Sequence, residues 1–235
     1  MRSPIKVILS VFVLAGLFSI NGTTDTKDIA FLFKTNGKVE IQQNGSKLWH
    51  GAKRGFRLNS GDKIRTGDNS LAALLFTDDK SLMKIRSRSD VIVKGERKQA
   101  SIAKSIFMQV GEVFISVKKQ RSVFRLETPT GVAAVKGTEF YGQMDEDGKF
   151  TILGISGIVE LINKYGSVLV KAGEKGISTG DKAPQSQKAA PGDGKTWGQE
   201  GDNNEPQYDE LEIPFKDKDG NIRTLQLRTK VKGKK

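Results

Sequence analysis

The sequence contains no cysteine and a single histidine, His50. The absence of cysteine excludes disulfide bonds, thiolate metal ligands, cysteine nucleophiles and lipid attachment to a cysteine. A single imidazole cannot form a metal centre with several histidine ligands, and general-base chemistry would have to use carboxylates or lysine. No nucleophile elbow and no complete calcium loop is present. We therefore predict a non-enzymatic protein without catalytic residues, cofactors or metal ions.

Apolar residues are also scarce, at 36% of 235 residues, so part of the chain should lie outside a packed core. Acidic residues are fewer than basic ones: the sequence has 27 Asp and Glu but 39 Lys and Arg, which gives a formal net charge of +12. The net charge does not predict the fold, but it favours binding to anionic partners.

The N-terminal segment has the layout of a secretory signal. Arg2 and Lys6 precede an uncharged, mostly apolar run over residues 7–20. That run is short compared with the roughly 20 residues of a membrane-spanning helix. We predict that residues 1–22 are a signal peptide or a short N-terminal anchor. The protein is then exported to the periplasm or cell envelope, or is secreted.

Residues 31–177 alternate between short apolar segments and turns, which predicts an all-β domain. The turns are rich in Gly, Asn and Asp, residues that tolerate positive φ. A weak repeat, Gly-x-Val, opens a strand at Gly37, Gly111 and Gly157. The predicted strands are 38–43, 63–66, 71–76, 82–85, 91–94, 106–110, 112–117, 123–127, 139–144, 149–155, 158–163 and 168–170.

The C-terminal part differs in composition. Residues 178–210 contain no Val, Leu, Ile, Met or Phe, so they are predicted to form a disordered linker. Leu211, Ile213 and Phe215 then alternate before a turn, which predicts a β-hairpin over residues 211–229. A basic tail, residues 230–235, follows.

Two segments resemble the FecR-type domain of bacterial envelope proteins. The first runs from Trp49 to Ala72, and the second contains the more specific motif, in which lysine stands where arginine is usual. The motif residues that we single out are Thr128, Pro129, Gly131, Val135, Lys136, Gly137, Thr138, Glu139 and Phe140. From the residues alone, we expect Gly137 to form a turn or bulge at a tight β corner.

The resemblance covers roughly residues 36–176 and implies a FecR-like β-solenoid or two-sheet sandwich. It implies a binding, sensing or scaffolding module of the envelope. Only six residues precede the apolar run, so we expect no direct anti-sigma activity. The alternative is an envelope carbohydrate-active or polysaccharide-processing enzyme on a β-rich scaffold, which would need a pair of carboxylates beside a cleft.

Basic residues cluster at Lys84, Arg86 and Arg88, which would share one face of a strand. We predict contact with an envelope protein, an anionic envelope polymer or a membrane surface. The alternative is a solvated face that protects a strand edge. Nucleic acid is not an expected partner, because aromatic residues are not interleaved with these cations. The oligomeric state is left open.

Overall fold

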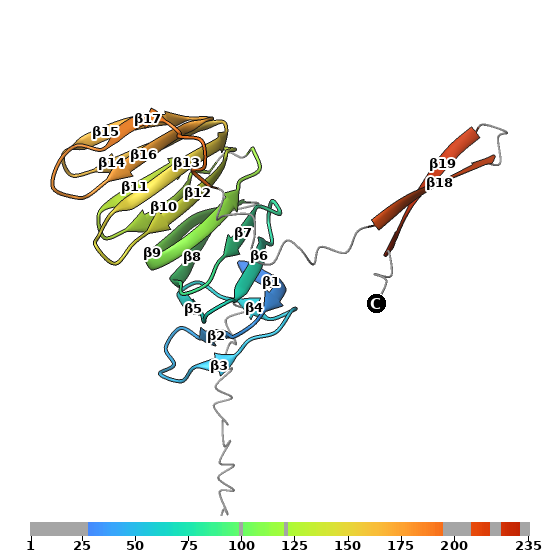
Figure 1. Ribbon diagram of the computed structural model, residues 1–235. Helices are drawn as coiled ribbons and strands as arrows, with labels where there is room; N and C mark the ends of the chain where they lie inside the picture. The colour runs from blue at the N-terminus through green and yellow to red at the C-terminus, as the bar shows by residue number, and fades with distance from the viewer. Residues whose placement is uncertain (1–27, 99–100, 120–121, 195–207, 217–221, 231–235) are drawn as a thin grey trace, which may run out of the picture.

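The computed structural model places every regular element of the described chain in β-strands, and the predicted all-β fold is confirmed (Figure 1). It describes residues 28–98, 101–119, 122–194, 208–216 and 222–230. The predicted signal segment and residues 231–235 of the predicted tail lie outside these ranges. Within them, no helix has the length and apolar character needed to cross a membrane.

The domain consists of two facing sheets, which we call sheet A and sheet B. Neighbouring strands within sheet A are antiparallel. In spatial order, sheet A contains β4 (Arg57–Leu58), β1 (Ala30–Asn36), β6 (Leu71–Phe76), β7 (Leu82–Ile85), the C-terminal half of β9 (Ser101–Ser116), β12 (Glu139–Met144), β13 (Phe150–Ser156), β16 (Glu174–Ser178) and β17 (Gln185–Lys188).

Sheet B is built in the same way, except that β9 and β10 run parallel. In spatial order, it contains β3 (His50–Gly51), β2 (Val39–Gln42), β5 (Asp62–Thr66), β8 (Asp90–Lys98), the N-terminal half of β9, β10 (Phe124–Thr128), β11 (Gly131–Val135), β14 (Ile158–Asn163) and β15 (Gly166–Lys171). Figure 1 shows the strands stacked from β2 and β3 at one end to β15 and β17 at the other.

Strand β9 belongs to both sheets and bends at Gly111, which has φ +120°. A Cβ atom here would lie 2.1 Å from Ser89 Oγ and 2.5 Å from Ser89 Cα, so only glycine fits. The bend links the sheets into one hydrogen-bonded network of 17 strands within the described residues. The sequence predicted two strands here, 106–110 and 112–117, and they are the two halves of β9.

The core fills the space between the sheets. Inward side chains alternate with outward ones, as in β5 and β12, because successive strand residues point to opposite faces. Phe76 of sheet A and Phe124 of sheet B meet edge to face, with ring centroids 5.8 Å apart. Both are fully buried, and burial of such a side chain contributes roughly 1.5–3 kcal/mol.

The chain changes sheets at turns between strands and at the bend within β9, and the Gly-x-Val repeat marks two such turns and this bend. Gly37, Gly111 and Gly157 all have positive φ and lie where one sheet gives way to the other. The architecture is therefore a two-sheet sandwich that winds like a solenoid. The sequence did not predict β1, in which apolar residues 30–33 do not alternate with polar ones, or β11, in which Gly131, Ala133 and Ala134 are small. It also did not predict the two-residue strands β3 and β4.

The predicted linker is wrong in its first part. Residues 185–188 form β17, which pairs with β16 at the edge of sheet A although all its residues are polar. An edge strand needs little apolar surface, because its backbone hydrogen bonds to one neighbour hold it. Residues 195–207 of the predicted linker lie outside the described residues, and its last three residues, 208–210, are part of a strand. The predicted C-terminal hairpin is present as β18 (Tyr208–Lys216) paired with β19 (Ile222–Lys230).

Candidate functional site: the motif turn and its cavity

The first half of the motif forms the turn between β10 and β11. Thr128 is the last residue of β10, and its Oγ1 donates to the carbonyl of Gly131 at 2.9 Å. The N–H of Gly131 donates back to Thr128 Oγ1 at 3.1 Å. Pro129 lies between them, where the absence of an N–H leaves no strand hydrogen bond unmade. The turn is thus closed by the threonine side chain.

The second half of the motif is the corner between sheet B and sheet A, as the sequence predicted. Gly137 has φ +99°, and a Cβ atom there would lie 3.0 Å from Lys119 Cα. Thr138 is buried, and its Oγ1 donates to the carbonyl of Ile158 at 3.1 Å. This hydrogen bond ties the corner to the start of β14.

The other motif residues mostly support this corner. Val135 and Phe140 are buried in the core, on either side of Gly137. Glu139 accepts a hydrogen bond from Ser116 Oγ at 2.8 Å across the pair β12 and β9. Lys136 is exposed. The motif therefore forms a turn and a corner. The corner residues Val135, Thr138 and Phe140 are buried, so the part of the motif that could contact a partner is the turn.

A cavity of about 370 Å³ lies beside the motif turn. Pro129, Val132 and Ile162 supply apolar walls, and Val132 and Ile162 are paired directly across β11 and β14. Among the described residues that line it, Lys164 is the only ionisable one. The lining consists of Thr128, Pro129, Thr130, Gly131, Val132, Ile162, Asn163, Lys164 and Gly180.

Hydrogen bonds fix the two turns that border this cavity, which we call the motif cavity. Ser178 Oγ donates to the carbonyl of Thr130 at 2.7 Å. Asn163 Nδ2 donates to Ser178 Oγ at 3.0 Å and to the carbonyl of Lys182 at 2.7 Å. The N–H of Tyr165 donates to Asn163 Oδ1 at 2.9 Å. These hydrogen bonds hold three separate segments together around the cavity, and ligand sites are usually largely preformed in this way.

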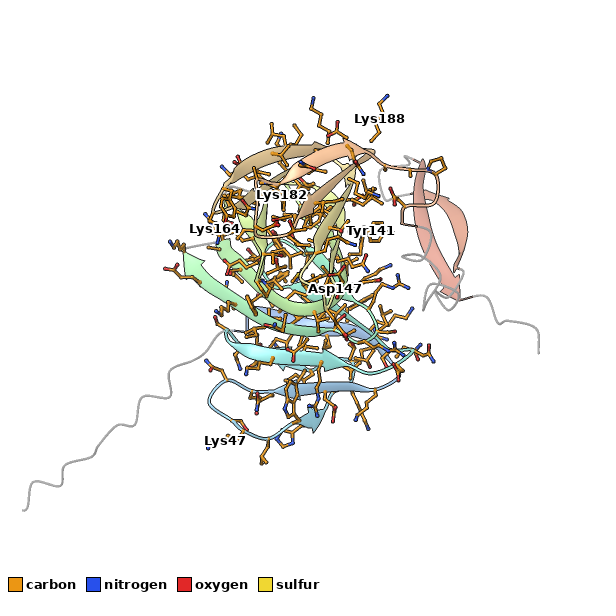
Figure 2. The ribbon with its side chains drawn as sticks, turned by 60° about the vertical axis from the view of Figure 1, so that its left-hand side comes forward. Lys47, Tyr141, Asp147, Lys164, Lys182 and Lys188 are labelled. Carbon is orange, nitrogen blue, oxygen red and sulfur yellow. The ribbon has the colours of Figure 1, made fainter. Side chains whose placement is uncertain are left out.

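The rim of the motif cavity is basic and aromatic. The Nζ of Lys164 lies 4.8 Å from the ring centroid of Tyr165, and 52% of Tyr165 is exposed. Figure 2 shows Lys164 and Lys182 at the end of the sandwich that contains β14 and β15. No carboxylate is among the described lining residues, so the cavity suits a neutral or anionic group.

The predicted basic strand face is wrong in its geometry. Strand β7 ends before Arg86, so Lys84, Arg86 and Arg88 do not share one strand. Arg86 is buried and forms an ion pair with Glu112 at 3.0 Å. Arg88 has positive φ in the following turn, where it pairs with Asp68. The three cations therefore do not form one surface, because Arg86 is buried and Arg88 lies in the turn that follows the strand of Lys84.

A buried charge cluster was missed from the sequence. The side chain of Lys104 is fully buried between Asp78 and Asp79. A signal for this was available, because Lys104 occupies the inward register of β9 between Ile102 and Ile106. Burial raises the pKa of Asp78, yet the hydrogen bonds from Lys104 Nζ and from Ile102 N–H outweigh burial and hold that pKa below its ordinary value.

Other candidate sites supply little chemistry. His50 is exposed on the two-residue strand β3. Within the described ranges, no group of His, Asp or Glu is arranged to hold a metal ion. Two further cavities of about 320 and 300 Å³ each have one carboxylate in their described lining, Asp193 and Glu96 respectively. None of these three linings supplies the carboxylate pair that glycoside hydrolysis uses.

The comparison with protein families tests the resemblance to the FecR family over most of this domain. Residues 62–160 match the family model described as FecR protein. This stretch is similar to that family, and we call it the FecR-type domain. It runs from β5 into β14 and includes the whole motif, so the resemblance predicted from the sequence is confirmed over that range. No curated protein sequence matches the chain.

Two solved structures are similar to the FecR-type domain and its surroundings. Both are crystal structures of a candidate anti-sigma factor from Parabacteroides distasonis, at 2.50 and 1.65 Å resolution. The first is 16% identical, with a TM-score of 0.47, and the match covers 54% of this chain and 59% of that one. The second is 14% identical, with a TM-score of 0.48, and the match covers 65% of this chain and 68% of that one.

Proposed function

We propose that the protein is an exported, non-enzymatic envelope module whose FecR-type domain binds a partner at the motif cavity. The single observation that carries this proposal is that the family motif itself forms one wall of a preformed cavity. The proposed partner is an envelope protein or an anionic envelope polymer, and the module senses or scaffolds it without direct anti-sigma activity.

The chemistry of the cavity supports a binding role. Its volume of about 370 Å³ is at the small end of the range of ligand sites, so it would accept one side chain or one sugar-sized group. Lys164 at the rim favours an anionic or hydrogen-bond-accepting group, while Pro129 and Val132 favour apolar contact. The enzymatic alternative lacks comparable support, because the described linings supply at most one carboxylate each.

The test uses the natural absence of cysteine, which lets one engineered cysteine carry a photoreactive crosslinker. A Tyr165→Cys variant places the crosslinker at the rim of the motif cavity and leaves Lys164 in place. A Lys188→Cys variant is the matched control, because Lys188 is also exposed but lies on β17 of the other sheet. We expect a discrete crosslinked product from bacterial envelope fractions with the first variant alone.

A second substitution makes this result specific to the cavity. Val132→Trp, added to Tyr165→Cys, would fill the cavity, and we expect it to abolish the crosslinked product. Circular dichroism would show whether the variant retains its β-structure. Equal products from positions 165 and 188, or a product unaffected by Val132→Trp, would contradict the proposed site.

Contact with an anionic surface through Lys84, Arg86 and Arg88 stays a separate prediction, with less support from the geometry. Because Arg86 is buried and ion-paired, the test should change only Lys84 and Arg88 to glutamine. We expect weaker retention on anionic phospholipid vesicles or lipopolysaccharide at low salt, and unchanged behaviour on zwitterionic vesicles. Retention equal to that of the unmodified protein would leave these residues as solvated edge protection.

A further inference from the structure

Lys104 is held between two carboxylates in the interior of the sandwich. Its Nζ lies 2.8 Å from Asp78 Oδ2 and 2.8 Å from Asp79 Oδ2. The exposed fractions of the three side chains are 0% for Lys104, 2% for Asp78 and 16% for Asp79. An amine and a carboxyl group are therefore in contact where almost no water reaches them.

The surroundings of this cluster are apolar and rigid. The ring centroid of Phe76 lies 5.2 Å from Lys104 Nζ, and Phe76 itself packs on Phe124. Asp78 Oδ2 also accepts the N–H of Ile102 at 2.8 Å. Burial of separate charges in such a place is costly, and replacement of the charges by neutral groups removes that cost.

The two carboxylates have different environments. Asp79 is oriented by Ser81, whose N–H donates to Oδ1 at 2.8 Å and whose hydroxyl donates to Oδ2 at 2.9 Å. Asp78 Oδ1 is buried and has no hydrogen-bond partner among the described residues. An unsatisfied buried oxygen is unfavourable, so Asp78 is the carboxyl group that would gain from losing an oxygen.

We propose that Lys104 and Asp78 become joined by an intramolecular amide bond between Lys104 Nζ and Asp78 Cγ. Asp79 carries protons for this reaction, since its Oδ2 contacts the same Nζ and its partial exposure gives water a way out. The proposal is independent of the binding function proposed above. It concerns a covalent modification that the chain would perform on itself.

The reaction balances without any co-reactant. One proton moves from the ammonium group of Lys104 to the carboxylate of Asp78. The hydrogen bonds to Asp78 favour its ionised form, so this neutral pair is a minor state through which the slow reaction passes. The amine lone pair then attacks Asp78 Cγ, so that a C–N bond forms. Asp79 takes a second proton from the nitrogen and delivers it to the departing oxygen. The C–O bond breaks, one water molecule leaves, and Asp79 ends as a carboxylate.

The product would act as a cross-link in a chain that has no cysteine. It would connect the turn after β6 to β9, across a separation of 26 residues. A covalent link of this kind stabilises a fold chiefly by restricting the unfolded chain, as a disulfide does. It would also remove two buried charges and free the core of their desolvation cost.

The test is the intact mass of the full-length protein, folded first and then denatured for mass spectrometry. We expect a mass lower by one water molecule than the mass calculated from the observed termini. Trypsin should fail to cleave after Lys104, and the peptide that contains Lys104 should be recovered attached to the peptide that contains Asp78. A Lys104→Arg variant keeps the positive charge but should show the full mass, and circular dichroism would confirm that it folds.

An internal control is available in the pair Lys175 and Asp193. Its atoms also approach to 2.8 Å, but the side chains are 20% and 24% exposed, so this pair should remain ionic. We expect an Asp79→Asn variant to form the link much more slowly than the unmodified chain. Full mass and normal cleavage after Lys104 in the folded protein would show an ion pair only and would overturn the proposal. Loss of water at Lys175 instead would overturn it equally.

Discussion

Replacement of Gly137 by alanine would impose two separate penalties on the motif corner. The first is backbone strain, because φ is +99° and an L side chain rarely adopts such a value. The second is crowding, because the new Cβ would lie 3.0 Å from Lys119 Cα and 3.3 Å from Lys119 N. Together these penalties should lower the free energy of unfolding by about 2–4 kcal/mol.

Two other glycines separate the penalties. Gly173 has φ +78°, and no described atom beyond its immediate neighbours would lie within 4 Å of an added Cβ. Gly173→Ala should therefore show strain alone and cost about 1–2 kcal/mol. Gly154 has no positive φ, but an added Cβ would lie 2.4 Å from the carbonyl oxygen of Lys171. Gly154→Ala should show crowding alone and cost about 1–3 kcal/mol.

Urea denaturation of the three variants and the unmodified protein measures these differences. Equal m-values would show that each variant unfolds from a comparable native state, so that a shift in the midpoint reports stability. We expect Gly137→Ala to lose at least about 1 kcal/mol more than Gly173→Ala. If the two variants lost the same amount, the close approach of Lys119 would not matter and the reasoning about the corner would be refuted.

Three further predictions concern charge and export. Arg86→Met should lower the free energy of unfolding by about 1–3 kcal/mol, because Glu112 loses a charged partner in a half-buried pair; an unchanged denaturation midpoint would contradict this. The hydrogen bond from Lys175 holds the pKa of Asp193 below its ordinary value of 3.8. The stabilisation that this pair gives the fold is therefore fully present above pH 3.8, and it is lost as the pH falls through the lowered pKa. In an NMR titration, Lys175→Met should move the Asp193 midpoint upward, and an unmoved midpoint would exclude the pair as the cause. A C-terminally tagged chain should fractionate with the periplasm, envelope or medium, and recovery in the cytoplasm would end the export hypothesis.

Most of the sheet could be predicted from the sequence because its signals are local. Strand β12, for example, was predicted with the bounds that the structure shows, since its residues alternate and a Gly-containing turn follows. Gly137 was expected at a corner, and its positive φ confirms that interpretation. Strand β17 was missed because an all-polar edge strand has no apolar pattern to read.

The candidate site was predicted only in part. The motif residues were identified, but the cavity needs Ile162, Asn163 and Gly180 as well, and these come from a different hairpin and the turn after β16. Sequence spacing does not specify which turns meet at the end of a sandwich. The bounds of β7 were predicted as 82–85, but the basic face assumed that the strand continued through Arg86 and Arg88, and β7 ends at Ile85.

The sequence by itself determined the strand period, the turn glycines and the family motif, because each depends on neighbouring residues and on backbone sterics. Only the tertiary structure decided where the charges lie. The side chain of Lys104 follows the inward register of β9 in sheet B, and it meets Asp78, in the turn after β6 of sheet A, only because the two sheets face each other. Pairing of this kind is set by the order of strands, a non-local property that no short stretch of sequence contains.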